Sequence, residues 1–288
     1  MQKIIPVLLL SLSSQIAWGA DVYKYWDWGN SPARENYEYA LLTMALEASA
    51  ETYGPYTLAR VRKELSTNRV RREINAGNII NVRSGPYLRL SNIENPEEVN
   101  LPVTVPIMQN LLGYRRLVVH KENVDTLSHI RKRDDLTQFS VGLARGWVDV
   151  DIFRANNIKV DDSANVATLI DMLELKRFDF FPASIVGLET VLDRASEQGD
   201  LVAIPDLVVV YPFPVVFYVP KAKPRLAERL QFGLQVLTDS GEVAQLLQRH
   251  FIQELNYLHS ENVHFITLSN PLLPGDLQMS HLPFYPKD

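Results

Sequence analysis

The chain has 288 residues, of which 46% are hydrophobic and 22% charged, so it is large enough for two domains or one large domain. This composition, with 13 Gly and 17 Pro, excludes a disordered, collagen-like or coiled-coil protein. A net charge of -5 provides no basic field for a polyanion, and we therefore expect no nucleic-acid partner. The absence of Cys excludes disulfides, thiolate zinc sites and cysteine nucleophiles, and suits an oxidising compartment.

The N-terminus has the features of a secretory signal peptide. Lys3 precedes an apolar run over 4–12, and small residues stand before a cleavage site after Gly19. We predict a signal peptide over 1–19 and a periplasmic mature protein. An uncleaved membrane anchor is the alternative, but an apolar run interrupted by Pro6 is much shorter than the roughly 20 residues that span a bilayer.

Strand and helix patterns alternate along the first third of the mature chain. A strand over 22–26, an amphipathic helix over 34–51 and a strand over 56–61 predict a right-handed parallel crossover. A helix over 67–76, ended by a glycine, and a strand over 78–83 repeat the unit. This alternation is typical of an α/β fold.

A second α/β series begins with a strand over 114–120. The predicted helices that follow are 124–133, 147–156, 165–174, 184–197, 224–237 and 241–254. The predicted strands between them are 138–142, 159–160, 178–181, 201–204 and 207–219. The return of helices after 207–219 predicts two lobes joined by two strand-like crossings, with a ligand cleft between them. Lobe 1 would contain 21–116 plus 216–288, and lobe 2 would contain 117–215.

Several segments carry a family resemblance over about 230 residues, from Val22 to Phe251. The segments are 67–82, 131–147 (RKRDDLTQFSVGLARGW), 172–184 (MLELKRFDFFPAS) and 209–251. They resemble the bilobal periplasmic solute-binding proteins, in particular the extracellular solute-binding family 3. The resemblance implies a type II periplasmic-binding-protein fold, a small-molecule ligand, no cofactor, and a membrane permease of the ABC transporter type or a sensor receptor as partner.

A branch of this family resembles the chain more closely. Its patterns appear here as Gly113-Tyr114-Arg115, Gly142 to Asp149, Arg177 to Pro182, Tyr211 to Pro214 and Leu268 to Pro274.

The chain lacks the two groups with which the family's amino-acid binders hold their ligand. Those proteins carry an Arg for the ligand carboxylate, whereas 91–98 (SNIENPEE) has Glu at the corresponding place. They also carry an acidic residue for the ligand ammonium, and Ser184 stands at that position, five residues after Asp179. The resemblance therefore implies a binding protein whose ligand is not a standard amino acid.

Loops after the predicted strands of the first lobe supply candidate ligand contacts, because ligands of such folds meet the carboxyl ends of strands. Trp26, Asp27 and Trp28 offer two indoles and a carboxylate for a ring or a cation. Packing at the hinge side of lobe 1 is the alternative. Arg83 and Ser84 end the third strand and are expected to face the cleft, with a solvated arginine on a loop as the alternative.

Candidates from two predicted helices complete the site. Gly146 and Trp147 are expected to begin a helix whose free backbone N–H groups receive an anion, with Trp147 as a lid. Asp149 stands in the first turn, where it stabilises the helix dipole with or without a ligand. Arg69 is expected to lie nearest the cleft edge of a basic helix, although a solvated helix face also explains it.

Enzyme and metal signatures are absent from the sequence. There is no G-x-S-x-G elbow, P-loop or H-E-x-x-H motif, and His259 with His264 lacks a third ligand for zinc. We predict a monomeric binding protein, without catalytic residues or metal, that closes over an anionic or ring-bearing solute for uptake or signalling. The alternative is an exported hydrolase or lyase on the same fold, which requires an acid/base pair in the cleft.

Overall fold

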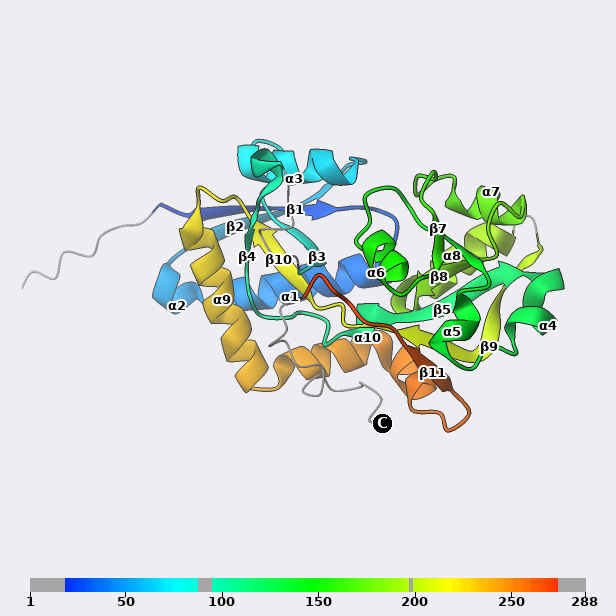
Figure 1. Ribbon diagram of the computed structural model, residues 1–288. Coiled ribbons are helices and arrows are strands. Elements are labelled where there is room, and N and C mark those ends of the chain that lie inside the picture. The colour runs from blue at the N-terminus through cyan, green and yellow to red at the C-terminus, as the bar shows by residue number, and fades with distance from the viewer. Residues whose placement is uncertain (1–18, 88–94, 197–198, 274–288) are drawn as a thin grey trace, which may run out of the picture.

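The computed structural model describes residues 19–87, 95–196 and 199–273 (Figure 1). The predicted signal peptide over 1–19 therefore lies outside the described residues, apart from Gly19. No helix in these three ranges is long and apolar enough to cross a membrane.

The first lobe contains two small sheets covered by helices. β1 and β2 pair in parallel with α1 between them in sequence, which confirms the predicted crossover. In the second sheet β10 lies between β3 and β4 and is antiparallel to both. The elements are β1 (Asp21–Asp27), α1 (Pro32–Ala48), α2 (Ala50–Tyr53), β2 (Tyr56–Arg62), α3 (Thr67–Ala76), β3 (Arg83–Pro86), β4 (Leu101–Pro102), β10 (Val215–Val219), α9 (Pro224–Asp239) and α10 (Glu242–Leu258).

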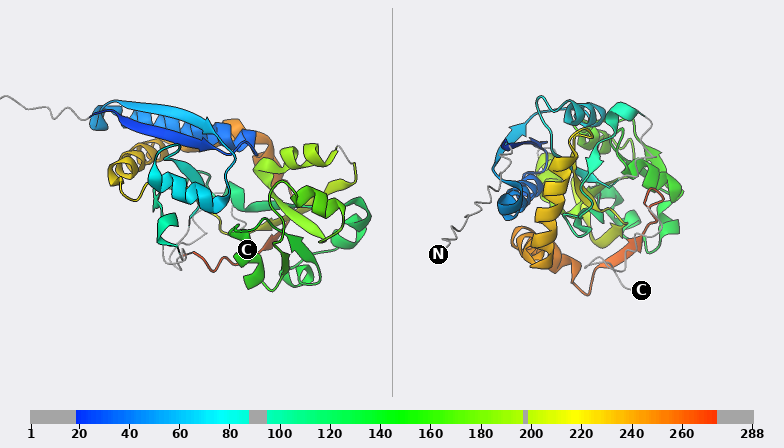
Figure 2. Two further views of the ribbon diagram at one scale, coloured as in Figure 1. Left: turned by 90° about the horizontal axis from the view of Figure 1, so that it is seen from above. Right: turned by 90° about the vertical axis from the view of Figure 1, so that its left-hand side faces the viewer.

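The second lobe is built on one mixed sheet with the strand order β11-β9-β5-β8-β6-β7. β5 is antiparallel to β8 and β9, whereas β6 is parallel to β7 and β8. Figure 2 separates these mostly green elements from the blue and cyan ones of the first lobe. They are β5 (Tyr114–His120), α4 (Val124–Leu127), α5 (Arg133–Leu136), β6 (Ser140–Gly142), α6 (Asp149–Ala155), β7 (Lys159–Asp161), α7 (Leu169–Glu174), β8 (Phe180–Ser184), α8 (Leu188–Ser196), β9 (Leu201–Val210) and β11 (His264–Thr267).

The chain passes between the two sets of strands three times. The first passage precedes β5, the second is the segment 211–214 (YPFP) between β9 and β10, and the third follows α10 and leads to β11. The predicted continuous strand over 207–219 is therefore wrong, because two prolines without N–H groups interrupt the strand ladder there.

The tail after α10 does not stay with the first lobe, to which the sequence prediction assigned all of 216–288. β11 pairs in parallel with the last four residues of β9, from His264 opposite Leu207 to Thr267 opposite Val210. Backbone pairing with an edge strand of the second sheet holds this segment.

The predicted strand over 78–83 is absent apart from its last residue, Arg83, which begins β3. Next to β1 this segment forms one isolated parallel bridge, between Tyr25 and Val82. The side chain of Asn81 explains the difference. Its Oδ1 accepts from the backbone N–H of Lys24 at 2.7 Å, and its Nδ2 donates to the carbonyl of Val22 at 2.7 Å. An amide side chain thus occupies backbone groups of β1 that a neighbouring strand would otherwise bind.

The predicted helix over 124–133 divides into α4 and α5. The Asp135 carboxylate accepts from the backbone N–H groups of Arg131 and Lys132, at 2.9 and 3.2 Å, and so caps a new helix start. The C-terminus of α3 agrees with prediction, since Gly77 ends it in the left-handed conformation with φ of +67°.

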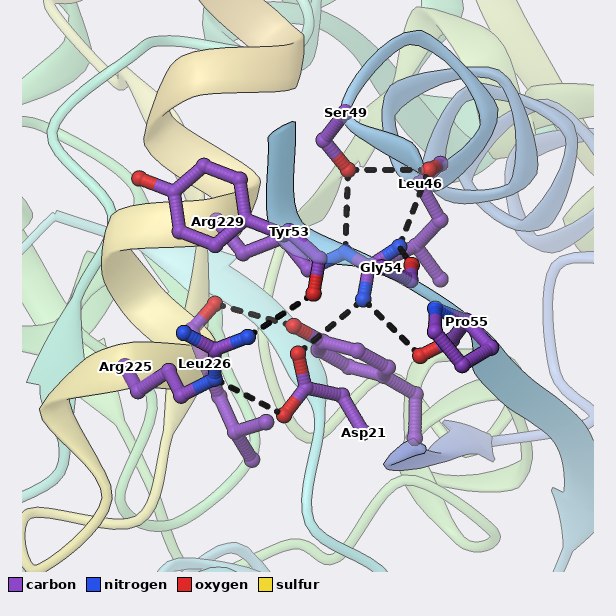
Figure 3. Close-up of polar contacts among 10 residues, drawn as sticks. Asp21, Leu46, Ser49, Tyr53, Gly54, Pro55, Arg225, Leu226 and Arg229 are labelled. Atoms are coloured by element: carbon purple, nitrogen blue, oxygen red, sulfur yellow. Dashed lines mark hydrogen bonds and ion pairs between the residues drawn. The ribbon is translucent and has the colours of Figure 1, made fainter. Parts of the chain in front are cut away.

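A buried arginine joins β1 to the helices of the first lobe (Figure 3). Arg229 of α9 is fully buried, and its guanidinium donates to Asp21 Oδ2 at 3.0 Å and to Ser49 Oγ at 2.9 Å. It also donates to three backbone carbonyls, those of Leu46, Gly54 and Pro55. Each of the three guanidinium nitrogens therefore has an acceptor, which offsets the cost of burying the charge.

Candidate functional site

A cavity of about 660 Å³ lies between the two lobes, and segments of both contribute to its wall. It contains most of the residues that the sequence analysis selected. The predicted residues on the wall are Trp26, Trp28, Arg83, Ser84, Gly146, Trp147, Asp149 and Ser184. Two predicted residues, Asp27 and Arg69, are not on this wall.

Asp27 points into an ion-pair cluster of the first lobe, and its expected ligand contact is therefore wrong. Its Oδ2 accepts from Arg60 Nε at 2.7 Å and from Arg62 Nη2 at 3.2 Å. Burial opposes ionisation, but a hydrogen bond with Glu35 and the Arg60 guanidinium hold the pKa of Asp27 below its ordinary value. β1 alternates its faces, so Asp27 points away from the side taken by Trp26 and Trp28.

Arg69 is exposed on α3, and the cavity instead meets the face of this helix that carries Val70 and Arg71. The alternative of a solvated helix face therefore holds for Arg69. Val70 is 2% exposed and fixes which side of the helix turns inward.

Arg83 is buried on the cavity wall, with 7% of its surface exposed. Its Nε donates to Asn100 Oδ1 at 3.1 Å, and its guanidinium carbon lies 4.0 Å from the ring centre of Tyr218. Within the described ranges no carboxylate lies within ion-pair distance of it, and burial lowers the pKa of Arg83 to about 10. Arg83 is thus a cation that neighbouring neutral groups hold but do not neutralise.

Ser84, beside Arg83, belongs to a polar network under the cavity wall. Its hydroxyl donates to Glu38 Oε2 at 2.6 Å and accepts from Arg34 Nη2 at 3.1 Å. Arg34 Nε in turn donates to Glu38 Oε1 at 2.7 Å, and Tyr25 donates to Glu38 Oε2 at 2.7 Å. The carboxylate of Glu38 is therefore saturated, and the network fixes Ser84 and Arg34 at the N-terminal part of α1.

Aromatic side chains approach the cavity from both lobes. Trp26 and Trp28 lie with ring centres 6.5 Å apart, and the Trp26 indole donates to the carbonyl of Lys63 at 2.8 Å. On the other lobe Trp147 lies 6.3 Å from Phe181, with the rings inclined by 41°. Each indole is only partly buried, so each keeps a surface for another molecule.

The helix start at the predicted anion site lies later in the chain than expected, and two of the backbone N–H groups before it are already used. α6 begins at Asp149, two residues later than expected, and has seven residues. The backbone N–H groups of Arg145 and Trp147 already donate to the carbonyls of Ala164 and Ala144, at 3.0 and 3.1 Å. Gly146, with φ of +80°, forms the turn that brings Trp147 to the wall.

Asp149 is buried and binds residues next to the first two passages between the lobes. Arg115 Nη2 lies 2.8 Å from its Oδ1, to which the Tyr211 hydroxyl also donates at 2.5 Å. The Arg115 guanidinium also lies 4.9 Å from the ring centre of Phe213. This cluster links α6 to the segments 113–115 and 211–214, which are two of the family-like patterns of the sequence. The Asp149 carboxylate therefore holds the hinge side of the cavity together.

Comparisons with known proteins place this geometry among solved structures. No protein-family model and no curated protein sequence matches the chain. An ancestral arginine-binding protein bound to arginine has 16% identity and a TM-score of 0.55, over 80% of this chain and 98% of its own.

Two further structures match in the same way. An amino acid ABC transporter substrate-binding protein from Streptococcus pneumoniae, bound to L-arginine, has 14% identity and a TM-score of 0.51, over 80% of this chain and 93% of its own. An ancestral amino acid-binding protein, a precursor of cyclohexadienyl dehydratase, has 13% identity and a TM-score of 0.52, over 80% of this chain and 95% of its own. The fold is that of the two-lobed solute-binding proteins. This confirms the predicted fold class.

The cavity wall also contains four arginines that the sequence analysis did not assign to the site. They are Arg34, Arg71, Arg115 and Arg194. Arg145, which lies in the family-like segment 131–147, is a fifth. Arg115 stood in a family-like pattern and Arg71 in the basic run of α3, so sequence signals existed for these two. Arg194 lies 164 residues after Asn30, to which its Nη2 donates at 3.1 Å across the lobes, and no local pattern reports such a contact.

Ser184 ends β8 of the solute-binding fold on the cavity wall, opposite Arg115 in the strand register. Its hydroxyl oxygen is buried and has no hydrogen-bond partner among the described residues. A hydroxyl at this place can donate to an anion but cannot neutralise an ammonium group.

His259 and His264 do not meet, since each contacts a separate backbone carbonyl, of Leu255 and Arg131 respectively. A different group could hold a metal ion, because ligand atoms of His120, Glu174 and Asp200 lie within 4.8 Å of one another. None of these three residues is on the cavity wall. Lys121 Nζ lies 4.0 Å from the exposed Asp200, so a lysine already supplies positive charge to this group.

Proposed function

We propose that the mature protein binds a small, ring-bearing organic anion in the cavity between its lobes. The observation that carries the proposal is Arg83, a buried cation on the cavity wall that has no carboxylate partner among the described residues. A buried charge is costly unless it is paired, and a ligand carboxylate bound by the guanidinium fork would supply the pair.

The indoles would recognise the ring of the ligand. Trp26 and Trp28 stand on the first lobe and Trp147 on the second, so closure of the lobes would place a planar group between aromatic faces. Ser184 would supply a hydroxyl donor from the second lobe, whereas the Ser84 hydroxyl already donates to Glu38. Binding across both lobes favours a closed conformation by the difference in ligand affinity between the open and closed states.

The biological role would be to report or deliver this solute at a membrane. With the predicted signal peptide over 1–19, the protein would work as a periplasmic monomer, with one lobe near 21–116 plus 216–258 and the other near 117–215, to which β11 adds a strand. Its partner would be an ABC-type permease or a sensor receptor that distinguishes closed from open lobes.

An exported hydrolase or lyase is the alternative function, since one similar structure is the precursor of a dehydratase. Catalysis of that kind needs a free acid/base pair. Among the described wall residues Asp149 is the one carboxylate, and Arg115 and Tyr211 occupy it. This favours binding without chemistry.

A thermal-shift titration tests the proposal with benzoate and indole-3-acetate, each against its neutral amide. The acids are expected to raise the melting temperature in a concentration-dependent way, because a ligand that binds only the native state stabilises it. The amides are expected to have little effect.

Two variants and a control locate the site. Arg83→Gln and Trp147→Ala should each weaken binding of the acid by about tenfold or more, whereas Arg69→Gln, on the exposed face of α3, should bind normally. Equal shifts by acids and amides, or unchanged affinity in both cavity variants, would contradict the proposal. A Trp147→Ala protein that melts earlier but binds normally would assign that indole to packing alone.

A further inference from the structure

The cavity wall carries an unusual charge distribution for a small-molecule site. Its described residues include one carboxylate, Asp149, and neither Lys nor His. The cations are Arg34, Arg71, Arg83, Arg115, Arg145 and Arg194.

Three of these arginines lie within ion-pair distance of carboxylates within or beneath the wall. Arg34 pairs with Glu38 at 2.7 Å and Arg115 with Asp149 at 2.8 Å. Arg71 lies 3.7 Å from Glu98, which it shares with Arg72 at 3.1 Å, so its charge is only partly offset. These pairs leave no carboxylate of the wall available for a further cation or for a ligand ammonium group.

The other three arginines contact only neutral groups. Arg83 bonds to Asn100 and stacks on the Tyr218 ring, as described above. Arg145 Nη2 donates weakly to the carbonyl of Ser163 at 3.4 Å, and Arg194 Nη2 donates to Asn30 Oδ1 at 3.1 Å. No described carboxylate lies within 4.0 Å of any of the three guanidinium groups.

The three uncompensated cations lie on opposite sides of the cavity. Arg83 belongs to β3 of the first lobe, whereas Arg145 precedes α6 and Arg194 belongs to α8 of the second lobe. Arg83 is buried, whereas Arg145 and Arg194 are exposed to solvent in this conformation. Closure of the lobes over a singly charged ligand would therefore remove water from Arg145 and Arg194 without giving them an anionic partner. A ligand with an anionic group at each end removes this cost on both sides.

We infer that the preferred ligand carries two anionic groups on a ring, one bound by Arg83 and the other by Arg145 and Arg194. This inference rests on the proposed function and specifies the chemical class of its solute. It separates the solute from zwitterionic amino acids, whose ammonium group would meet cations, and from simple monocarboxylates.

Calorimetric titration with four probes tests the inference: benzoate, isophthalate, terephthalate and zwitterionic phenylalanine. At low ionic strength we expect at least one dicarboxylate to bind ten or more times more tightly than benzoate, and phenylalanine to bind more weakly than benzoate. The dicarboxylate affinity should also fall more steeply with added salt, because more charge is screened.

Variants of the second-lobe arginines identify the source of the preference. The double variant Arg145→Gln/Arg194→Gln should reduce the preference for the dicarboxylate over benzoate to less than about threefold. Arg69→Gln is the matched control and should preserve the preference. Circular dichroism and melting temperature would establish that the double variant is folded.

The outcomes separate the two proposals. Equal binding of benzoate and both dicarboxylates, or a preference that survives the double variant, would overturn the second anionic subsite and leave the proposed function intact. Failure of all four probes to bind would contradict both the ring-bearing anion of the proposed function and the inference built on it.

Discussion

Replacing Arg83 with Gln should separate binding from folding. At 7% exposure the guanidinium is desolvated, and its pKa falls from the ordinary arginine value to about 10. A shift of that size corresponds to about 3 kcal/mol of unfavourable folding free energy at neutral pH. Because the folded-state pKa of this base is lowered, the penalty applies at every pH below about 10 and declines only as the pH rises from there toward the ordinary arginine pKa.

Contacts of Arg83 act against this penalty. The hydrogen bond to Asn100 is worth about 1.5–3 kcal/mol for a charged donor, and the stacking on Tyr218 about 0.5–2 kcal/mol. A Gln amide can keep part of the first contact. The gain and the loss are of similar size, so Arg83→Gln should change the free energy of unfolding by no more than about 2 kcal/mol, in either direction.

Binding should respond much more strongly than stability. Removing one partner of a desolvated charge pair costs about 2–5 kcal/mol, which is a loss of at least about 30-fold in affinity. Urea unfolding at pH 7 and titration with an acid that binds the unmodified protein would measure both quantities. A loss of more than about 4 kcal/mol of stability with unchanged affinity would refute the reasoning and make Arg83 a structural residue.

Three further predictions concern the fold. Gly233→Ala should destabilise the protein by several kcal/mol in urea unfolding, because a Cβ on α9 would lie 1.9 Å from the Ala45 carbonyl oxygen of α1. Gly241→Ala is the control: its Cβ would meet open space, so this variant measures only the backbone strain of a positive φ. Arg229→Met should cost about 3–5 kcal/mol, since it leaves Asp21 without its buried partner, whereas the exposed Arg62→Met should cost about 1 kcal/mol or less. Burial raises the pKa values of Tyr25 and Tyr211, so their stabilising contribution is complete below pH 10 and is lost above it; melting temperatures that stay constant to pH 12 would contradict this.

Local sequence rules predicted those elements whose cause is local. The strand 22–26, the helix ended by Gly77 and the strand 114–120 depend on periodicity and on a left-handed cap, and all three are present. The strand expected over 78–83 failed because the Asn81 side chain binds β1 in place of the backbone. Periodicity carries no information about such a tertiary hydrogen bond.

The candidate site was predictable to the extent that strand ends determine it. Trp26 and Trp28 stand at the carboxyl end of β1 and reach the cavity, as that position implies. Arg83 also reaches the cavity, but as the first residue of β3 and not at the end of the strand expected over 78–83. Side-chain direction was the weak point: Asp27, one residue from Trp26, points to Arg60, and Arg71 rather than Arg69 faces inward. A rotation of one or two residues along an element decides which side chain a ligand meets, and packing sets that rotation.

A comparison of Arg83 with Arg229, another buried arginine of the first lobe, supports the functional interpretation of Arg83. Arg229 is fully buried and donates to a carboxylate, a hydroxyl and three backbone carbonyls, so the fold alone accounts for its charge. Arg83 is almost as buried, yet it has one side-chain amide, a weak contact at 3.4 Å to the adjacent Ser84 carbonyl and one aromatic ring, and it faces a cavity. The same lobe thus satisfies one buried guanidinium completely and leaves the other short of an anion. Since an unpaired buried charge reduces stability, its presence at the cavity is explained when a ligand supplies the missing negative charge.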